Sequence, residues 1–325
     1  MKYARGEKAG APYNPRAVTR YAPAALVAAL LAATGFAFLH TESLKLETSP
    51  IRQTRVTKTF SPVCRCDSSR ARIGLRLAKP DVLSVSIVDY SGSDVRRLAT
   101  DRPGRDRVAF LWNGRDDTGR VVADGFYRAR VRLGLQEQTF LLPNLIRVDT
   151  KRPGLDLVSV QPRVFSPDGD RRADRITVRY KVDEPAGALL FVDGVQRVVG
   201  ASLRPTGELE WYGKVGGASL PARRYGLALA AIDRAGNRSL SVRAGPVRIR
   251  YVELASPVLR AKAGGVLRVR VSTDARRISW RLGKRKGVGK TPVFRIRAPQ
   301  APGRYRIVVT ASGHHAGAFV VVAGP

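Results

Sequence analysis

Histidine, cysteine and methionine are scarce in this sequence. Its 325 residues include three histidines, two cysteines and one methionine. No HExxH zinc motif, Ser–His–Asp order, phosphate-binding loop or C-x-x-C pair occurs. His314 and His315 are adjacent, so an extended chain would point them to opposite sides, which is poor geometry for holding one metal. The sequence therefore predicts a protein that is not an enzyme and has no cofactor.

Acidic residues are the next shortage. Asp and Glu number 26 against 58 Lys and Arg, which gives a formal net charge of +32 and a pI of about 11.3. An excess of this size indicates an anionic neighbour, such as nucleic acid, a membrane surface or an acidic polymer. A codon bias that favours arginine over lysine would leave the net charge unchanged, so it does not explain the missing acids.

Long apolar runs are also rare, and only one segment is long enough to concern a membrane. Residues 22–39 read "APAALVAALLAATGFAFL", eighteen residues without a charge. As a helix this run would extend about 27 Å, close to the thickness of a bilayer's hydrocarbon core. Only Glu7 opposes the cations that precede it, which are Lys2, Arg5, Lys8, Arg16 and Arg20. The positive-inside rule then predicts a cytoplasmic tail over residues 1–21 and a single-pass transmembrane anchor over residues 22–40.

A cleaved signal peptide is the alternative to this anchor. The stretch "FAFLHTES" offers no clean small-x-small cleavage site, and the leading tail is long. The anchor is therefore favoured, with the protein in the cell membrane and its modules outside the cytoplasm; the alternative is secretion after cleavage. Both interpretations export the body of the protein, so nucleic acid is not expected as a partner.

Helical periodicity is absent from the rest of the chain. Residues 41–57 are polar and unpatterned, and we interpret them as a stalk or a lead-in strand. Beyond them apolar residues alternate with polar ones, as in residues 127–133, 176–182 and 267–271. Gly, Pro, Asp and Asn separate these stretches at short intervals. This pattern is typical of antiparallel β-sandwiches.

Two units of one design follow each other along the chain. "FSPVCRCDSSRARIGLRL" begins at Phe60 and "FSPDGDRRADRITVRY" at Phe165. In each unit a Trp follows, and a Tyr opens a strand fourteen or fifteen positions later. The units are assigned to residues 58–148 and 149–253. A third all-β domain is assigned to residues 254–325; it lacks the FSP opening and looks only distantly related.

The first unit carries the pattern W-x-G-x-D-x-x-G followed by D-G-x-Y. Its residues are Trp112, Gly114, Asp116, Gly119, Asp124, Gly125 and Tyr127. This pattern resembles the FlgD-type immunoglobulin-like domain of the flagellar hook-capping protein, a domain found in bacterial exported and surface proteins. The second unit keeps Trp211 and Tyr225 but has "ARRY" where the first has Asp-Gly before the Tyr. The resemblance implies tandem immunoglobulin-like sandwiches with a scaffold or adhesive role and no catalytic residues.

The acids of "WNGRDDTGRVVADGFY" are interpreted as parts of a strand connection. Asn113, Gly114 and Gly119 suit positive φ angles. Asp116 and Asp117 are expected to accept hydrogen bonds from turn amides rather than to form an acidic site.

Two other small clusters could carry chemistry. Asp168, Asp170 and Asp174 are weak candidates for calcium ligands, but two arginines lie among them and no Glu closes the loop, so a strand-connecting turn is favoured. Cys64 and Cys66 are expected to form a local disulfide outside the cytoplasm, which requires a bend in the chain. Free thiols, a redox pair and a lipid-linked pair stay open as alternatives.

The segment "GKRKGVGK" concentrates Lys284, Arg285, Lys286 and Lys290 on an expected hairpin tip. This tip is either an anion contact or a solvated turn whose charge discourages edge pairing.

The sequence favours a membrane-anchored, non-catalytic structural or adhesive protein of the cell envelope. Its modules would contact an anionic envelope polymer or an envelope protein. Two alternatives remain: an assembly or capping factor for a surface appendage, and an accessory binding subunit of a secreted hydrolase.

Overall fold

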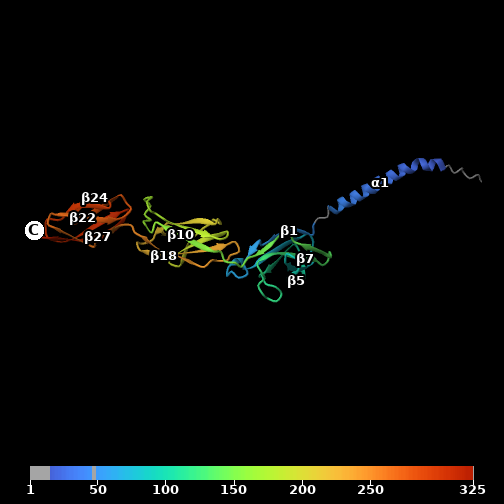
Figure 1. The fold of residues 1–325 in the computed structure, drawn as a ribbon, viewed down its shortest axis with the longest axis horizontal. Coiled ribbons are helices and arrows are strands. Elements are labelled where there is room, and N and C mark those ends of the chain that lie inside the picture. The colour runs from blue at the N-terminus through green and yellow to red at the C-terminus, as the bar shows by residue number, and fades with distance from the viewer. Residues whose placement is uncertain (1–14, 46–48, 325) are drawn as a thin grey trace, which may run out of the picture.

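One helix and three β-sandwiches follow one another in a row (Figure 1). The structure is a computed structural model that describes residues 15–45 and 49–324, with side chains of the helix described from residue 23 to residue 39. We call the sandwiches the first, second and third module in chain order. The prediction of tandem β-sandwiches is confirmed.

The helix α1 (Pro15–Lys45) includes the apolar run but begins before it and has Pro23 inside. Over the part of the chain that the structure describes, no helix is long and apolar enough to cross a membrane. The single-pass anchor predicted for residues 22–40 is therefore not supported. Most of the predicted tail, residues 1–14, lies outside the described residues.

Residues 41–57 are predicted to form a stalk or a lead-in strand, and part of them is a lead-in strand of the first module. Residues 46–48 lie outside the described residues, but Ile51–Val56 form strand β1, which pairs with β3. A register shift between Ile51 and Gln53 breaks the two-residue alternation. This irregularity is why the strand shows no pattern in the sequence.

The first module packs a three-stranded sheet, β1-β3-β6, against a larger sheet with the order β2-β9-β7-β4-β5, to which β8 adds beside β7. The further elements are β2 (Thr59–Phe60), η1 (Asp67–Ser69), β3 (Ala71–Leu77), β4 (Asp81–Val88), β5 (Asp94–Gly104), β6 (Arg107–Trp112), β7 (Gly125–Leu133), β8 (Gln138–Leu141) and β9 (Ile146–Val148).

The second module repeats this arrangement with β10-β12-β15 against β11-β19-β18-β13-β14, and β16 and β17 form a small separate hairpin. Its strands are β10 (Leu155–Gln161), β11 (Val164–Phe165), β12 (Ile176–Val182), β13 (Ala186–Val192), β14 (Val195–Val199), β15 (Thr206–Trp211), β16 (Lys214–Val215), β17 (Ala218–Ser219), β18 (Arg224–Asp233) and β19 (Val242–Ile249).

The third module has the same strand order again, β20-β22-β25 against β21-β27-β26-β23-β24. In all three modules a short strand pairs in parallel with the module's last strand, and the other sheet contacts are antiparallel. The third module therefore shares the full topology that its sequence only suggested. Its strands are β20 (Glu253–Leu254), β21 (Val258–Lys262), β22 (Val266–Ser272), β23 (Arg277–Leu282), β24 (Arg285–Lys290), β25 (Val293–Arg297), β26 (Gly303–Ala311) and β27 (His314–Ala323).

Equivalent aromatic residues fill the cores of the first two modules. Trp112 lies edge-on to Phe60 and Tyr127, at centroid distances of 5.4 and 5.1 Å. Trp211 repeats these contacts with Phe165 at 5.5 Å and Tyr225 at 5.8 Å. Both tryptophans are buried, and edge-to-face packing adds to the free energy gained from burial.

A tyrosine hydroxyl closes the same corner in every module. Tyr127 donates to the carbonyl of Ala123, Tyr225 to that of Pro221 and Tyr305 to that of Ala301, each at 2.8 Å. The spacing of four residues is the same each time. This bond is a known mark of immunoglobulin-like sandwiches, and here it includes the third module among them.

Candidate functional site

The acidic stretch after β6 is a strand connection. The carboxylate of Asp116 accepts hydrogen bonds from the amides of Thr118 and Arg120, both at 2.9 Å, and from the Thr118 hydroxyl. The Thr118 hydroxyl and these amides hold the pKa of Asp116 below its ordinary value. Asp117 accepts from the amide of Arg97 at 3.1 Å. The structure therefore uses these acids to fix the turn.

The glycines of this stretch have the positive φ angles expected for them, +69° at Gly114 and +84° at Gly119, whereas Asn113 does not. Trp112 donates its indole N–H to the carbonyl of Arg115 at 3.0 Å. Asp124 lies before β7, where its carboxylate accepts from the amide of Thr150 at 2.8 Å. Gly125 begins β7.

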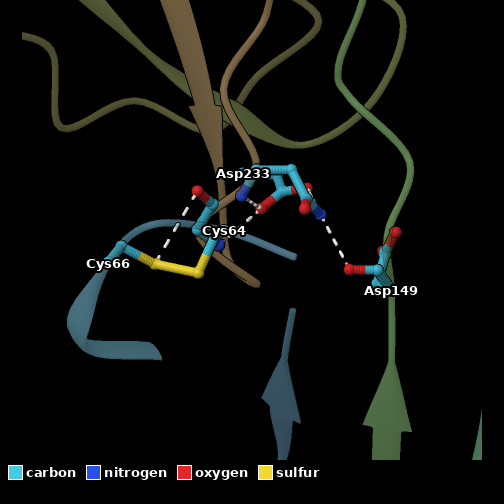
Figure 2. Close-up of a disulfide and its surroundings, with 6 residues drawn as sticks. Cys64, Cys66, Asp149 and Asp233 are labelled. Carbon is cyan, nitrogen blue, oxygen red and sulfur yellow. Dashed lines mark hydrogen bonds between the residues drawn. A yellow bond between two sulfur atoms is a disulfide. The ribbon is translucent and has the colours of Figure 1, made fainter. Parts of the chain in front are cut away.

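The cysteines lie at the joint between the first and second modules (Figure 2). Cys64 and Cys66 form a disulfide, with an S–S distance of 2.12 Å. The disulfide lies against the β18–β19 turn of the second module, where a β-carbon added at Gly236 would collide with the Cys66 sulfur. Asn237 of the same turn donates to the carbonyl of Asp149 at 2.8 Å. The disulfide loop is thus part of the surface on which the second module rests.

Three acids meet at the same joint, each offering a carboxylate oxygen within 4.8 Å of the others: Asp149, Glu184 and Asp233. Arg147 pairs with Asp149 at 2.9 Å. Asn237 donates to Asp233 at 2.8 Å. Oε1 of Glu184 is buried without a hydrogen-bond partner, and burial, followed by the charges of Asp149 and Asp233, raises the pKa of Glu184.

The other acidic cluster, Asp168, Asp170 and Asp174, lies in the loop between β11 and β12. Its carboxylate oxygens also lie within 4.8 Å of one another. Asp174 accepts from the amides of Gly169 and Arg171, both at 2.7 Å, and Asp170 accepts from the amide of Arg172 at 2.8 Å. These bonds show a loop stabilised by its own acids.

The predicted hairpin tip is wrong for most of its residues. Only Gly283 and Lys284 form the turn; Arg285–Lys290 is the strand β24, paired along its whole length with β23. A β-carbon at Gly287 would collide with the ring of Trp280, and one at Gly289 with the ring of Phe294. Gly287 and Gly289 are therefore sites where an edge strand passes close to aromatic rings.

The third module is the most basic part of the chain. Residues 254–325 contain fifteen Lys and Arg and one acid, Asp274. Residues 58–148 contain seventeen Lys and Arg and ten acids, and residues 149–253 contain eighteen Lys and Arg and twelve acids. Within residues 254–324, which the structure describes, no Lys or Arg forms an ion pair. The shortage of acidic residues in the sequence is thus concentrated in the third module.

Eight of these cations share the outer face of the five-stranded sheet, which we call the cationic face. Arg277 lies opposite Lys290 and Arg281 opposite Lys286 on the paired strands β23 and β24. Like charges directly opposite on neighbouring strands repel and destabilise a sheet. All eight side chains are exposed: Arg260, Lys262, Arg277, Arg281, Lys286, Lys290, Arg304 and Arg306.

A hollow of about 720 Å³ lies on the cationic face. Arg281 and Lys286 line it with the hydroxyls of Ser279 and Thr310 and with His315. On the same face the guanidinium of Arg304 lies over the ring of Phe319, 3.7 Å from the centroid. The hollow offers cationic and neutral donors and no acid. It suits an anionic ligand held by charge and by hydrogen bonds to hydroxyls.

Sequence reasoning located Lys286 and Lys290 but missed the rest of the cationic face. The missed residues are spread over the strands β21, β23 and β26, two on each, so no local cluster marks them. The available signal was regional: a single acid in the last 72 residues, next to strands in which every second residue is Arg.

Neither a family model nor a curated protein matches this chain, and the solved structures described next resemble it only distantly. Fibronectin(III)-like modules of CbhA from Clostridium thermocellum are 13% identical with a TM-score of 0.35, over 61% of this chain and 93% of theirs. FlgD from P. aeruginosa is 19% identical with a TM-score of 0.23, over 35% of this chain and 84% of its own. SGBP-B of the Bacteroides ovatus mixed-linkage glucan utilization locus, in complex with a mixed-linkage heptasaccharide, is 15% identical with a TM-score of 0.25, over 84% of this chain and 71% of its own. Values this low assign neither a family nor a function; the strand order and the tyrosine corners make these modules immunoglobulin-like.

Proposed function

We propose that this chain is a non-catalytic binding protein whose third module retains an anionic polymer outside the cytoplasm. The observation that carries the proposal is the cationic face, where like charges lie opposite one another and no acid of the described residues pairs with them. The repulsion lowers the stability of the sheet. A polyanion would supply the missing negative charge and would be concentrated by the field of the face.

The location outside the cytoplasm rests on the Cys64–Cys66 disulfide, because disulfides persist in oxidising compartments and are rare in the cytosol. The hook-capping pattern of the first module, Trp112 to Tyr127, adds the proposal of a scaffold role. In this arrangement the first two modules are spacers that place the third module at the far end of the row (Figure 1).

Binding to the cationic face is expected to be mostly electrostatic. Exposed charges are screened over about 8 Å at physiological ionic strength, so retention should weaken as salt rises past that range. Selectivity among polymers should be low, because arginine and lysine on a sheet surface recognise charge more than shape. Carboxylate and phosphate polymers should therefore both be retained.

The test compares two double variants of the full chain that remove the same charge. Arg281→Ser with Lys286→Ser neutralises one opposed pair of the cationic face. Arg197→Ser with Arg204→Ser is the control, because both residues are exposed cations of the second module without an ion pair in the described structure.

Retention on immobilised polygalacturonate and on immobilised polyphosphate is measured across a salt series. The first variant should elute at clearly lower salt than the wild type, and the control should elute close to it. Equal shifts for both variants would mean that only net charge matters. Wild-type protein that binds neither polymer at low salt would overturn the proposed function.

A further inference from the structure

The cationic face continues across the joint into the second module. A cleft of about 940 Å³ lies at this joint, and we call it the joint cleft. Arg171 and Arg172 line it from the β11–β12 loop, and Arg276, Arg277 and Lys290 line it from the third module. All five side chains are exposed. Two modules thus contribute cations to one space. Two of these cations, Arg277 and Lys290, also belong to the cationic face.

The acids next to Arg171 and Arg172 serve the loop rather than the arginine side chains. Asp174 accepts the backbone amide of Arg171, and Asp170 accepts that of Arg172. Arg171 takes a φ of +67°, in the left-handed region that few non-glycine residues adopt. Neither guanidinium forms an ion pair within the part of the chain that the structure describes. The loop is held by its carboxylates while both arginine side chains stay available to the cleft.

Asp274 of the third module also lines the joint cleft, but it forms no ion pair with these cations in the described structure. Both carboxylate oxygens of Asp274 are buried and have no hydrogen-bond partner among the described residues. Burial, and then the charge of Asp168, raises the pKa of Asp274 to about 6. Asp274 therefore loses its charge on mild acidification, and the cationic excess of the cleft grows.

We propose that the joint cleft binds a phosphate group of a linear phosphorylated polymer, between Arg171 and Arg172 on one side and Arg276, Arg277 and Lys290 on the other. This inference rests on the proposed function, because a polymer lying along the cationic face reaches the cleft through Arg277 and Lys290. A phosphate oxygen pair matches the guanidinium fork, which donates two parallel hydrogen bonds. No aromatic side chain is among the residues that line the cleft, so stacking on a sugar ring contributes nothing there.

One consequence distinguishes the cleft from the cationic face. A phosphate held in the joint cleft touches both modules, so its binding fixes the angle between them. A ligand on the cationic face alone touches only the third module. Phosphate polymers should therefore restrict motion at the joint, and carboxylate polymers should not.

The experiment uses the full chain with Arg171→Ser and Arg172→Ser together. Both backbone amides remain, so the loop keeps its hydrogen bonds to Asp170 and Asp174. The control is again Arg197→Ser with Arg204→Ser, which removes the same charge from the same module. The probes are long-chain inorganic polyphosphate, inorganic phosphate alone and polygalacturonate, and affinity is measured by calorimetry near 0.15 M salt.

The cleft variant should bind polyphosphate about tenfold more weakly than the wild type, the loss expected when charge-assisted hydrogen bonds disappear. Its affinity for polygalacturonate and the affinity of the control for both polymers should change less than about threefold. The cleft site would be overturned if the cleft variant bound polyphosphate as tightly as the wild type while the double variant Arg281→Ser with Lys286→Ser bound it more weakly. That result would leave the proposed function intact.

The remaining arms separate the sources of phosphate. If inorganic phosphate competed for the cleft as well as polyphosphate does, at equal phosphate concentration, the inference that the ligand is a polymer would be overturned. Wild-type protein that binds polygalacturonate but not polyphosphate would refute the cleft inference alone.

Discussion

The second and third modules share one topology but arrange charge in opposite ways. In the three-stranded sheet of the second module Arg179 lies opposite Glu208, and the two form an ion pair at 2.7 Å. In the corresponding strands of the third module Arg268 lies opposite Arg295. Both sheets form because buried residues on the other side of each strand hold them together. The surface of this fold is therefore free to carry either attraction or repulsion.

The first module shows which feature matters. Arg76 and Arg107 also lie opposite each other, so an opposed pair of arginines is not specific to the third module. Asp106 contacts both, at 2.9 and 3.7 Å, and neutralises part of the repulsion. The third module lacks such an acid in its described residues. The absence of a bridging acid, more than the arginines themselves, marks the surface that needs an external anion.

The largest expected effect tests the cores rather than the surfaces. Trp211→Ala should destabilise the second module by about 3–5 kcal/mol, because it removes a buried ring in contact with Phe165 and Tyr225. Trp280→Ala should cost the third module about 1–3 kcal/mol, since Trp280 is only partly buried beside Phe294. Hydrogen exchange under denaturant, followed separately for peptides of each module, measures both values. Equal losses would show that the third core depends on its tryptophan as strongly as the second.

Much of the fold follows from the sequence because strand alternation records which side chains face the core. Residues 127–133 and 176–182 alternate cleanly, and both are strands as expected. The Trp–Tyr spacing likewise predicted equivalent positions in the first two modules. These features are local, so a single sequence is enough to show them.

The candidate sites depend on contacts between distant segments, and the sequence could not supply these. Arg171 and Lys290 lie about a third of the chain apart and meet only because two modules abut at a joint. Asp149, Glu184 and Asp233 come together in the same way at the other joint. The prediction also failed at β24, where residues expected at a hairpin tip form a strand and Gly287 accommodates the ring of Trp280.

The next prediction concerns the unpaired acid of the third module. The pKa of Asp274 is about 6 in the fold, above its ordinary value of 3.8. Between these values the folded state keeps a proton that the unfolded chain has lost, so stability falls as pH rises from about 4 to 6. Asp274→Asn should therefore stabilise the third module at pH 7, by at most about 3 kcal/mol and less where water reaches the group.

Thermal unfolding of wild type and variant at pH 4, 5, 6 and 7 provides the measurement. The difference in melting temperature should be small at pH 4 and grow to a plateau above pH 6. Asp156→Asn is the control, because Asp156 is an exposed acid on β10 of the second module. A difference that is constant across the series would show that Asp274 is not protonated in the fold.

The smallest expected effect exchanges the charge arrangements of the two modules. Arg295→Glu gives the third module an ion pair with Arg268, and Glu208→Arg gives the second module an opposed pair with Arg179. Cross-strand pairs of this kind contribute about 0.2–1 kcal/mol, so the first change should stabilise its module and the second should destabilise its own by similar amounts. Hydrogen exchange resolved by module, at low and high salt, should show both effects shrinking as charges are screened. If Arg295→Glu stabilises the third module but lowers retention on polyphosphate, the repulsion is kept for binding at the expense of stability. If it stabilises without any loss of retention, the arginines of this smaller sheet lie outside the binding surface, and the cationic face alone holds the polymer.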